Sequence, residues 1–455
     1  MLRLLFLLLG AQLLKSRWLV LVGVAVACLT LGVAIFIDIA DDGLLSVPLD
    51  TLALLLVVEG VVEILSAIVA NLRINWPGVA KGAGFLFIAF LVFDNPGDNN
   101  ITASLLFGMA FLLDGLFRLI STSLMRCRLW HKKIWLGVTE LLFSVVIFSN
   151  WPFHHHVTVP LCFALMLLGW GLVMLSMARQ IWQLPANASV TTLPMYTSRG
   201  LRHPHGTAYV HPSFPAEAPD TPLIMLIWTP VGSACVKERR LLFDRYLAAV
   251  DQQGVISTGH AALQFGDEIY ISHYPVDDID RDFTNFRAVL RAGEEYDVPG
   301  CFLSSLQQEI DDWCIPDLRI NLSRFNAEAL RNYWQIYSAD TTYNLTSRNC
   351  STSVIQALDV AMEGVLSARG LSAFRLLLEP DFWLLGLVRG RAEGMTWTPG
   401  LVMDYVLLLK KVIAPPRRLA WHSRLRESFA QRRALLVSHS LRLKKGAPRS
   451  GEPLP

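Results

Sequence analysis

Two histidines and a cysteine stand in local sequences that suit nucleophilic chemistry. His260 and His273 lie at the ends of a segment of largely apolar residues that turns at Gly266 and Asp267. A two-residue turn there uses the positive φ that glycine supplies, and counting outward places His260 opposite His273. Directly opposed residues in an antiparallel pair have Cβ atoms about 5 Å apart. We expect one of the two to act as a base and the other to orient it. The alternative is two half-buried sheet residues, and a register shift of one residue would separate the rings.

The cysteine stands at the predicted start of a helix. Cys350 follows a polar stretch, residues 343–349, and precedes residues 351–362, whose apolar positions have helical spacing. Free N–H groups and the helix dipole lower the pKa of a thiol in this position. A buried, inert cysteine is the alternative, but the polar neighbours Asn349 and Ser351 argue against it. We expect Cys350 to be a nucleophile, with N–H groups around these neighbours stabilising an oxyanion.

The order of two His strands followed by Cys at a helix start resembles the circularly permuted branch of the NlpC/P60 papain-like superfamily. That branch includes lecithin:retinol acyltransferase-like enzymes and bacterial amidases and peptidases, and its Cys often stands in an Asn-Cys dipeptide, here Asn349-Cys350. The resemblance covers residues 223–365 and implies an α+β domain. It implies Cys350 as nucleophile, His260 as base, His273 as third residue, and an acyl-thioester mechanism. No cofactor is expected, and the substrate stays open.

Residues 1–182 have the composition of a membrane domain. The whole chain is 53% hydrophobic and only 17% charged, far from a soluble average. Residues 2–14 are leucine-rich but too short to span a bilayer. We expect an interfacial helix or an extension of the first span there, with a signal peptide as the alternative. Six apolar stretches approach the ~20 residues that a span needs: 18–37, 50–71, 78–93, 101–122, 134–150 and 157–178.

An internal repeat supports three helical hairpins within this all-α membrane bundle. Polar residues 56 positions apart end the first, third and fifth spans, namely Asp38, Asp94 and Asn150. Glycines in the middle of the second, fourth and sixth spans predict close helix–helix approach; they are Gly60, Gly115 and Gly171. The pattern resembles the HdeD family of bacterial acid-resistance membrane proteins, which implies an association with stress or acid resistance.

Ionisable residues within the spans are expected to pair with one another and lock the helices; a proton relay is the alternative. These residues are Glu59, Glu63, Asp114, Arg118 and Glu140. The loop containing His154, His155 and His156 is expected to be solvated, with pH sensing near the ordinary pKa of ~6.5 as the alternative. Basic residues gather in the second and fourth connections, which predicts that both termini and the site are cytoplasmic, at a bacterial inner membrane. The cysteines form no CxxC pattern, so we expect free thiols and no metal site.

Three further segments complete the predicted organisation. Residues 183–222 are a proline-rich linker or strap, and residues 366–415 are a helical extension. Residues 416–455 form a basic amphipathic or disordered tail, expected to bind anionic lipids and not nucleic acid. Together the features predict a membrane-anchored cysteine hydrolase, a peptidase or amidase, with possible homo-oligomers. An acyl hydrolase or acyltransferase acting on lipids and a non-enzymatic stress module with an inactive papain-like scaffold are the alternatives.

Overall fold

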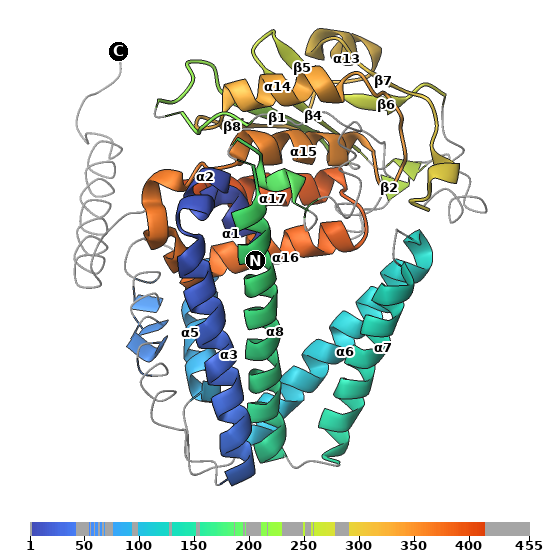
Figure 1. The fold of residues 1–455 in the computed structure, drawn as a ribbon. Helices are drawn as coiled ribbons and strands as arrows, with labels where there is room; N and C mark the ends of the chain where they lie inside the picture. Colours follow the sequence, from blue (N-terminus) through green and yellow to red (C-terminus); the bar gives the residue numbers. More distant parts are fainter. Residues whose placement is uncertain are drawn as a thin grey trace, which may run out of the picture. The chain divides into compact units, whose positions relative to one another are not determined.

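The computed structural model describes most of the chain, and Figure 1 shows its elements. The described residues are mostly helical, with a small antiparallel sheet. They fall in two compact units, one within residues 1–29, 110–144 and 168–414, the other within residues 30–109 and 145–167. The longer described ranges are 2–41, 76–92, 99–126, 130–151, 155–185, 187–193, 211–215, 217–229, 259–277 and 291–414. The shorter ones are single positions between 54 and 68, position 196, and residues 249–250 and 256–257.

Long apolar helices occupy the N-terminal region: α3 (Trp18–Asp41), α5 (Trp76–Val92), α6 (Asn99–Met125), α7 (Trp130–Ser149) and α8 (His155–Gln183). Three of the described helices are long and apolar enough to cross a membrane, over Trp18–Ile39, Ser104–Met125 and Pro160–Gln183. The helix α5, with 17 residues, is shorter than these, and α7 begins with charged residues. Most of the predicted span 50–71 lies outside the described residues.

Glycine contacts recur at equivalent positions of the repeat, as predicted. An added Cβ would lie about 3 Å from a backbone carbonyl of the neighbouring helix at each of the three positions. The contacts are Gly60 with Gly82 (2.9 Å), Gly115 with Gly137 (3.0 Å) and Gly171 with Ala25 (3.0 Å). Because real Cβ atoms rarely approach this closely, only glycine allows the two backbones to pack here. The prediction of close approach at these glycines is confirmed.

Arg118 joins two of these helices through carboxylates. Its Nε donates to Glu140 Oε2 of α7 at 2.9 Å, and its Nη2 donates to Asp114 one turn earlier in α6 at 2.7 Å. Two acidic partners leave no isolated charge on the guanidinium. The predicted pairing of Arg118 is therefore present between α6 and α7.

A four-stranded antiparallel sheet lies at the centre of the C-terminal part, with the order β5-β4-β1-β8. Its strands are β1 (Leu223–Trp228), β4 (His260–Phe265), β5 (Ile269–Ile271) and β8 (Leu318–Leu322). Alternate residues of these strands face opposite sides, and the larger side packs on helices α14 (Ala327–Tyr337), α15 (Cys350–Met362) and α17 (Pro399–Ile413). The smaller side contains Leu226, Trp228, Ala262 and Tyr270 and meets Leu306 of α13 (Leu306–Asp312). The helix predicted to begin at Cys350 and to continue over residues 351–362 is confirmed.

The hairpin register differs from the predicted one. Phe265 pairs with Ile269, so the loop contains three residues and not two, with Gly266 at φ +54°. This extra residue shifts the opposing strand by one position. The strand β5 then ends at Ile271, and His273 belongs to β6 (His273–Pro275), which pairs with β7 (Gly300–Phe302). The expected opposition of the two histidines is therefore wrong.

The N-terminal leucine run is also placed differently from its prediction. The helix α1 (Leu2–Leu9) has six consecutive residues, Leu4 to Leu9, that are at most 1% exposed. All of them except Leu7 pack in the same hydrophobic core as the sheet and α15. The backbone N–H of Gly364 donates to Leu7 O at 3.0 Å, and that of Leu366 donates to Leu8 O at 2.8 Å. Leu2–Leu9 is thus a core helix, not an interfacial helix or an extension of the first span.

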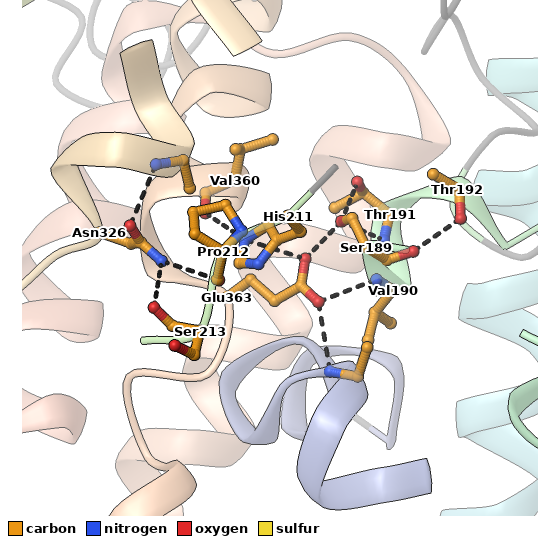
Figure 2. Close-up of polar contacts among 12 residues, drawn as sticks. Ser189, Val190, Thr191, Thr192, His211, Pro212, Ser213, Asn326, Val360 and Glu363 are labelled. Atoms are coloured by element: carbon orange, nitrogen blue, oxygen red, sulfur yellow. Dashed lines mark hydrogen bonds and ion pairs between the residues drawn. The ribbon is translucent and has the colours of Figure 1, made fainter. Parts of the chain in front are cut away.

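A buried carboxylate holds the corner after α1 (Figure 2). Glu363 Oε1 accepts the backbone N–H of Ala11, which begins α2 (Ala11–Ser16), at 3.2 Å, and that of Val190 at 2.9 Å. Its other oxygen accepts the Ser189 hydroxyl and lies 3.5 Å from His211 Nε2. Three segments distant in sequence therefore converge on one side chain. The described parts of 183–222 act as a strap along this domain, one of the two predicted possibilities.

The predicted helical extension is confirmed. It consists of the 3-10 segment η3 (Ser367–Leu378), α16 (Pro380–Gly394) and α17. Arg389 of α16 is buried and binds Asp359 of α15 through two hydrogen bonds of 2.7 and 2.5 Å, and it also donates to Tyr405 of α17 at 2.9 Å. This shared guanidinium ties the extension to the helix that begins with Cys350.

Candidate active site

Cys350 is the first residue of α15, and its neighbour builds the helix start. Asn349 is the N-cap: its Oδ1 accepts the backbone N–H of Thr352 at 2.8 Å, and its own N–H donates to Thr352 Oγ1 at 2.7 Å. The Asn349 amide also donates to Leu345 O at 2.8 Å and to Trp397 O at 3.2 Å. Asn349 therefore fixes the position of Cys350, and its side chain is engaged in capping.

The thiol of Cys350 is half-buried and faces His260. Burial raises the pKa of Cys350, but the positive charge of His260, its hydrogen bond and the N–H of Ala261 outweigh that effect, so the pKa is lowered. Burial likewise lowers the pKa of His260, and the Cys350 thiolate together with Glu309 raises it above its ordinary value. These opposite shifts favour a thiolate–imidazolium pair. Ser351 is fully buried, and its hydroxyl lies 3.8 Å from Cys350 Sγ.

The other side of the His260 ring contacts a carboxylate that sequence reasoning missed. His260 Nε2 lies 2.8 Å from Ser272 Oγ and 3.2 Å from Glu309 Oε1. Because Nε2 is engaged there, Nδ1 is the ring nitrogen available to the thiol. Glu309 stands in α13 beside the exposed acids Asp311 and Asp312, and nothing in its sequence context distinguishes it from them.

Tyrosines and tryptophans surround this contact. Tyr274 donates to Glu309 Oε1 at 2.6 Å and stacks on His260 with ring centroids 4.3 Å apart, and Tyr270 donates to the second carboxylate oxygen. Burial is the largest cause that raises the pKa of both tyrosines, and the hydrogen bond and the charge of Glu309 raise it further, so they remain protonated donors. The ring centroids of Trp228 and His260 lie 5.5 Å apart. The imidazole is thus held in a fixed orientation.

His273 occupies a different environment from the one predicted. Its Nε2 lies 3.1 Å from Thr341 O, its Nδ1 lies 3.0 Å from Ser353 Oγ, and its ring stacks on Phe302 at 4.4 Å. Burial is the largest cause that lowers the pKa of His273 to about 4, so the ring is neutral near pH 7. The group that contacts His260 is Glu309, and His273 supports the loop and helix around Cys350. The one-residue register shift explains the difference.

The loop before Cys350 is braced by a cation. Arg348 Nη1 donates to Asp340 Oδ2 at 2.5 Å, and its guanidinium lies 4.6 Å from the Tyr337 ring centroid. The backbones of Asn344 and Arg348 exchange hydrogen bonds of 3.1 and 3.0 Å. These contacts close the turn that positions Cys350 at the start of α15.

The remaining predicted residues belong to other elements or lie outside the described residues. Asp114, Arg118 and Glu140 form the helix lock described above. His155 and His156 begin α8. Within the described part of the chain, no group of three His, Cys, Asp or Glu side chains has the geometry of a metal site. The residues that lie outside the described ranges are Glu59, Glu63, His154 and the tail 416–455.

Comparisons of the chain with family models, with curated proteins and with solved structures found no match. The resemblances to the permuted NlpC/P60 branch and to the HdeD family therefore stay predictions from the sequence.

Proposed function

We propose that the protein is a membrane-anchored cysteine hydrolase with Cys350 as nucleophile, His260 as base and Glu309 as the residue that orients the base. The observation that carries this proposal is the chain of contacts from the half-buried thiol through the His260 ring to the buried Glu309 carboxylate. A nucleophile that contacts a base, and a base that contacts an orienting group, are the elements of covalent acyl transfer.

Glu309 determines which ring nitrogen carries the proton in neutral His260. An ionised carboxylate only accepts hydrogen bonds, so it favours a proton on Nε2 and leaves the lone pair of Nδ1 for the thiol. The thiol proton then passes to Nδ1, and the resulting imidazolium is stabilised by Glu309 at 3.2 Å. This arrangement gives His260 the two protonation states that a base and a later acid need.

The reaction follows from this geometry. Cys350 Sγ attacks the carbonyl carbon, and the carbonyl oxygen becomes an oxyanion. Helix geometry leaves the N–H groups of Cys350 and Ser351 without intrahelical acceptors, so they suit oxyanion stabilisation. When the tetrahedral intermediate collapses, the bond to the leaving group breaks and His260 gives that group its proton. Water activated by His260 then cleaves the thioester, releasing the acid and restoring the thiol.

Peptide or amide bonds are the first substrate class we propose. Lipid acyl groups are the second, and the three apolar helices specifically favour them, because they hold the site beside a bilayer. The six-helix bundle of HdeD type, the permuted papain-like fold, the cytoplasmic placement and the link to stress or acid resistance belong to the same proposal. An inactive papain-like scaffold within a stress module is the competing account.

Hydrolysis that depends on Cys350 tests this proposal. Purified full-length protein is incubated with fluorogenic peptide amides, activated acyl esters and phospholipids. Cys350→Ser removes the nucleophile, and Cys314→Ser is the matched control because Cys314 is also half-buried but packs near Trp228, whose Nε1 donates to its carbonyl. We expect hydrolysis that Cys350→Ser abolishes and Cys314→Ser retains. Hydrolysis that is equal in both variants, or absent for every substrate, contradicts the enzyme proposal and favours the scaffold.

A further inference from the structure

A cavity of about 280 Å³ lies between the end of α6, the start of α7 and α16. Its volume accommodates about nine water-sized groups at ~30 Å³ each. Its polar lining comprises Asp114, Arg118, Ser121, Thr122, Lys133 and Arg391. Three cationic side chains therefore face the cavity with one carboxylate, which favours an anionic ligand.

The two guanidinium groups can accept such a ligand while keeping their present partners. Arg391 Nη1 lies 3.1 Å from Asp114 Oδ1, and the guanidinium lies 4.2 Å from the Phe117 ring. Each guanidinium has five N–H donors, and planar donors of this kind match the oxygens of a phosphate. Ser121 and Thr122 are buried beside them, and the Ser121 hydroxyl donates to Arg118 O at 3.2 Å. This combination of cations and hydroxyls suits a phosphate ester.

The cavity lies near the end of an apolar span. Ser121 and Thr122 precede Met125, the last residue of the span Ser104–Met125, by about one turn, roughly 5 Å along the helix axis. Lipid headgroups lie at this depth, because the hydrocarbon core is about 30 Å thick and the polar regions extend beyond it. A basic pocket beside the end of a transmembrane helix suits an anionic headgroup.

The apolar part of the lining continues onto an exposed surface of α16. Trp383, Leu384 and Leu387 are 50%, 51% and 57% exposed, and Leu387 also lines the cavity. Their spacing puts them on one side of the helix. An acyl chain against Leu387 and Phe117 is compatible with a headgroup among the cations.

We propose that this cavity binds the phosphate headgroup of an anionic phospholipid, with Arg391, Arg118 and Lys133 as the cationic contacts. The proposal is independent of the hydrolase chemistry, because the cavity contains none of the residues assigned to catalysis.

Glycine at position 390 provides a direct test. No atom lies within 4 Å of a Cβ built on Gly390, which lines the cavity, so Gly390→Leu fills the space without a clash at Cβ. Gly169→Leu is the matched control, because Gly169 is also helical and open but does not line the cavity. Full-length protein of each variant, and of Arg391→Gln, is titrated with phosphatidylglycerol and with phosphatidylcholine in detergent, and native mass spectrometry measures the bound lipid. Inorganic phosphate is added as a competitor.

We expect one phosphatidylglycerol to bind the wild type at least about tenfold more tightly than phosphatidylcholine. Arg391→Gln should weaken the binding of phosphatidylglycerol by about tenfold, the scale of one charged hydrogen bond. Gly390→Leu should weaken this binding by about tenfold as well, because it fills the cavity. Gly169→Leu should leave the binding unchanged. Equal binding of both lipids, or equal effects of Gly390→Leu and Gly169→Leu, would overturn the proposal. Complete displacement by millimolar phosphate would indicate a site for free anions and would also overturn it.

Discussion

Glu309 and Glu363 are both 1% exposed, and each lies beside a histidine. Glu309 contacts His260, whose other side faces the half-buried Cys350 thiol. Glu363 contacts Nε2 of His211, and this nitrogen also lies 3.4 Å from the carbonyl oxygen of Val360 inside the core. Both pairs therefore consist of a carboxylate and an imidazole. They differ in the next group, which is a thiol beside His260 and a backbone carbonyl beside His211.

The partners of the carboxylates differ in the same way. Glu309 accepts two tyrosine hydroxyls from neighbouring strands, which orient it toward one imidazole. Glu363 accepts backbone N–H groups from Ala11 and Val190, segments that are distant in sequence (Figure 2). One buried carboxylate thus fixes a histidine, which we propose is a base, beside a thiol, and the other joins chain segments. The comparison teaches that composition alone does not distinguish these roles.

Replacing the two histidines should produce the largest contrast. His260→Ala removes the base and should lower Cys350-dependent hydrolysis by about 10²–10⁴-fold, the range for loss of a general acid–base group. His211→Ala should leave the rate of the folded protein within about twofold. The measurement is initial velocity on the fluorogenic substrate, with thermal melting as the control for folding. Similar losses in both variants would remove the distinction between the pairs.

A third buried histidine shows what the partners contribute. His273 binds a carbonyl and a hydroxyl, and its pKa is lowered to about 4, mainly by burial. The unfolded chain, with an ordinary pKa near 6.5, binds a proton between pH 6.5 and 4 that the folded protein does not. The free energy of unfolding is therefore highest above pH 6.5. It falls by about 3 kcal/mol as the pH decreases from 6.5 to 4. His273→Asn should flatten the pH dependence of the free energy of unfolding in this window, as measured by denaturant titration. An unchanged slope would contradict the assignment.

Replacing the carboxylates should give smaller and complementary effects. Glu309→Gln should lower hydrolysis about tenfold, because the amide no longer stabilises the imidazolium, with little change in melting. Glu363→Gln should lower the free energy of unfolding by about 1–3 kcal/mol, since a buried acceptor is replaced in part by a donor. Its effect on the rate should be slight. The two variants are compared by kcat/KM and by denaturant unfolding, and an exchange of their effects would refute the proposed roles.

Local patterns in the sequence predicted much of the fold around the site. The helix α15 and the place of Cys350 at its start follow from short-range periodicity and from the polar residues before it. These features depend on neighbours in the chain. The glycine contacts of the membrane repeat were predictable because the same spacing occurs three times.

Three features depended on contacts that local patterns do not contain. The hairpin register depends on whether Gly266 opens a loop of two or three residues, and a single residue decides which side chain faces His260. Glu309 approaches from a helix 49 positions after His260, beside similar acids. A run of leucines is equally suited to lipid and to a protein core, so the location of α1 depends on its docking onto Gly364 and Leu366.

The most direct test of the central claim compares two thiols within one protein. Burial, and also the charges of Asp317 and Glu309, raises the pKa of Cys314, whereas His260 lowers the pKa of Cys350. Labelling with iodoacetamide across pH 5 to 9, read at each cysteine by mass spectrometry, measures both reactivities in the same sample. We predict that Cys350 reacts faster than Cys314 near pH 7, that its rate falls as pH decreases through its lowered pKa, and that His260→Ala removes the difference. Equal rates at the two cysteines in the wild type, or a difference that survives His260→Ala, would contradict a histidine-activated thiolate at Cys350.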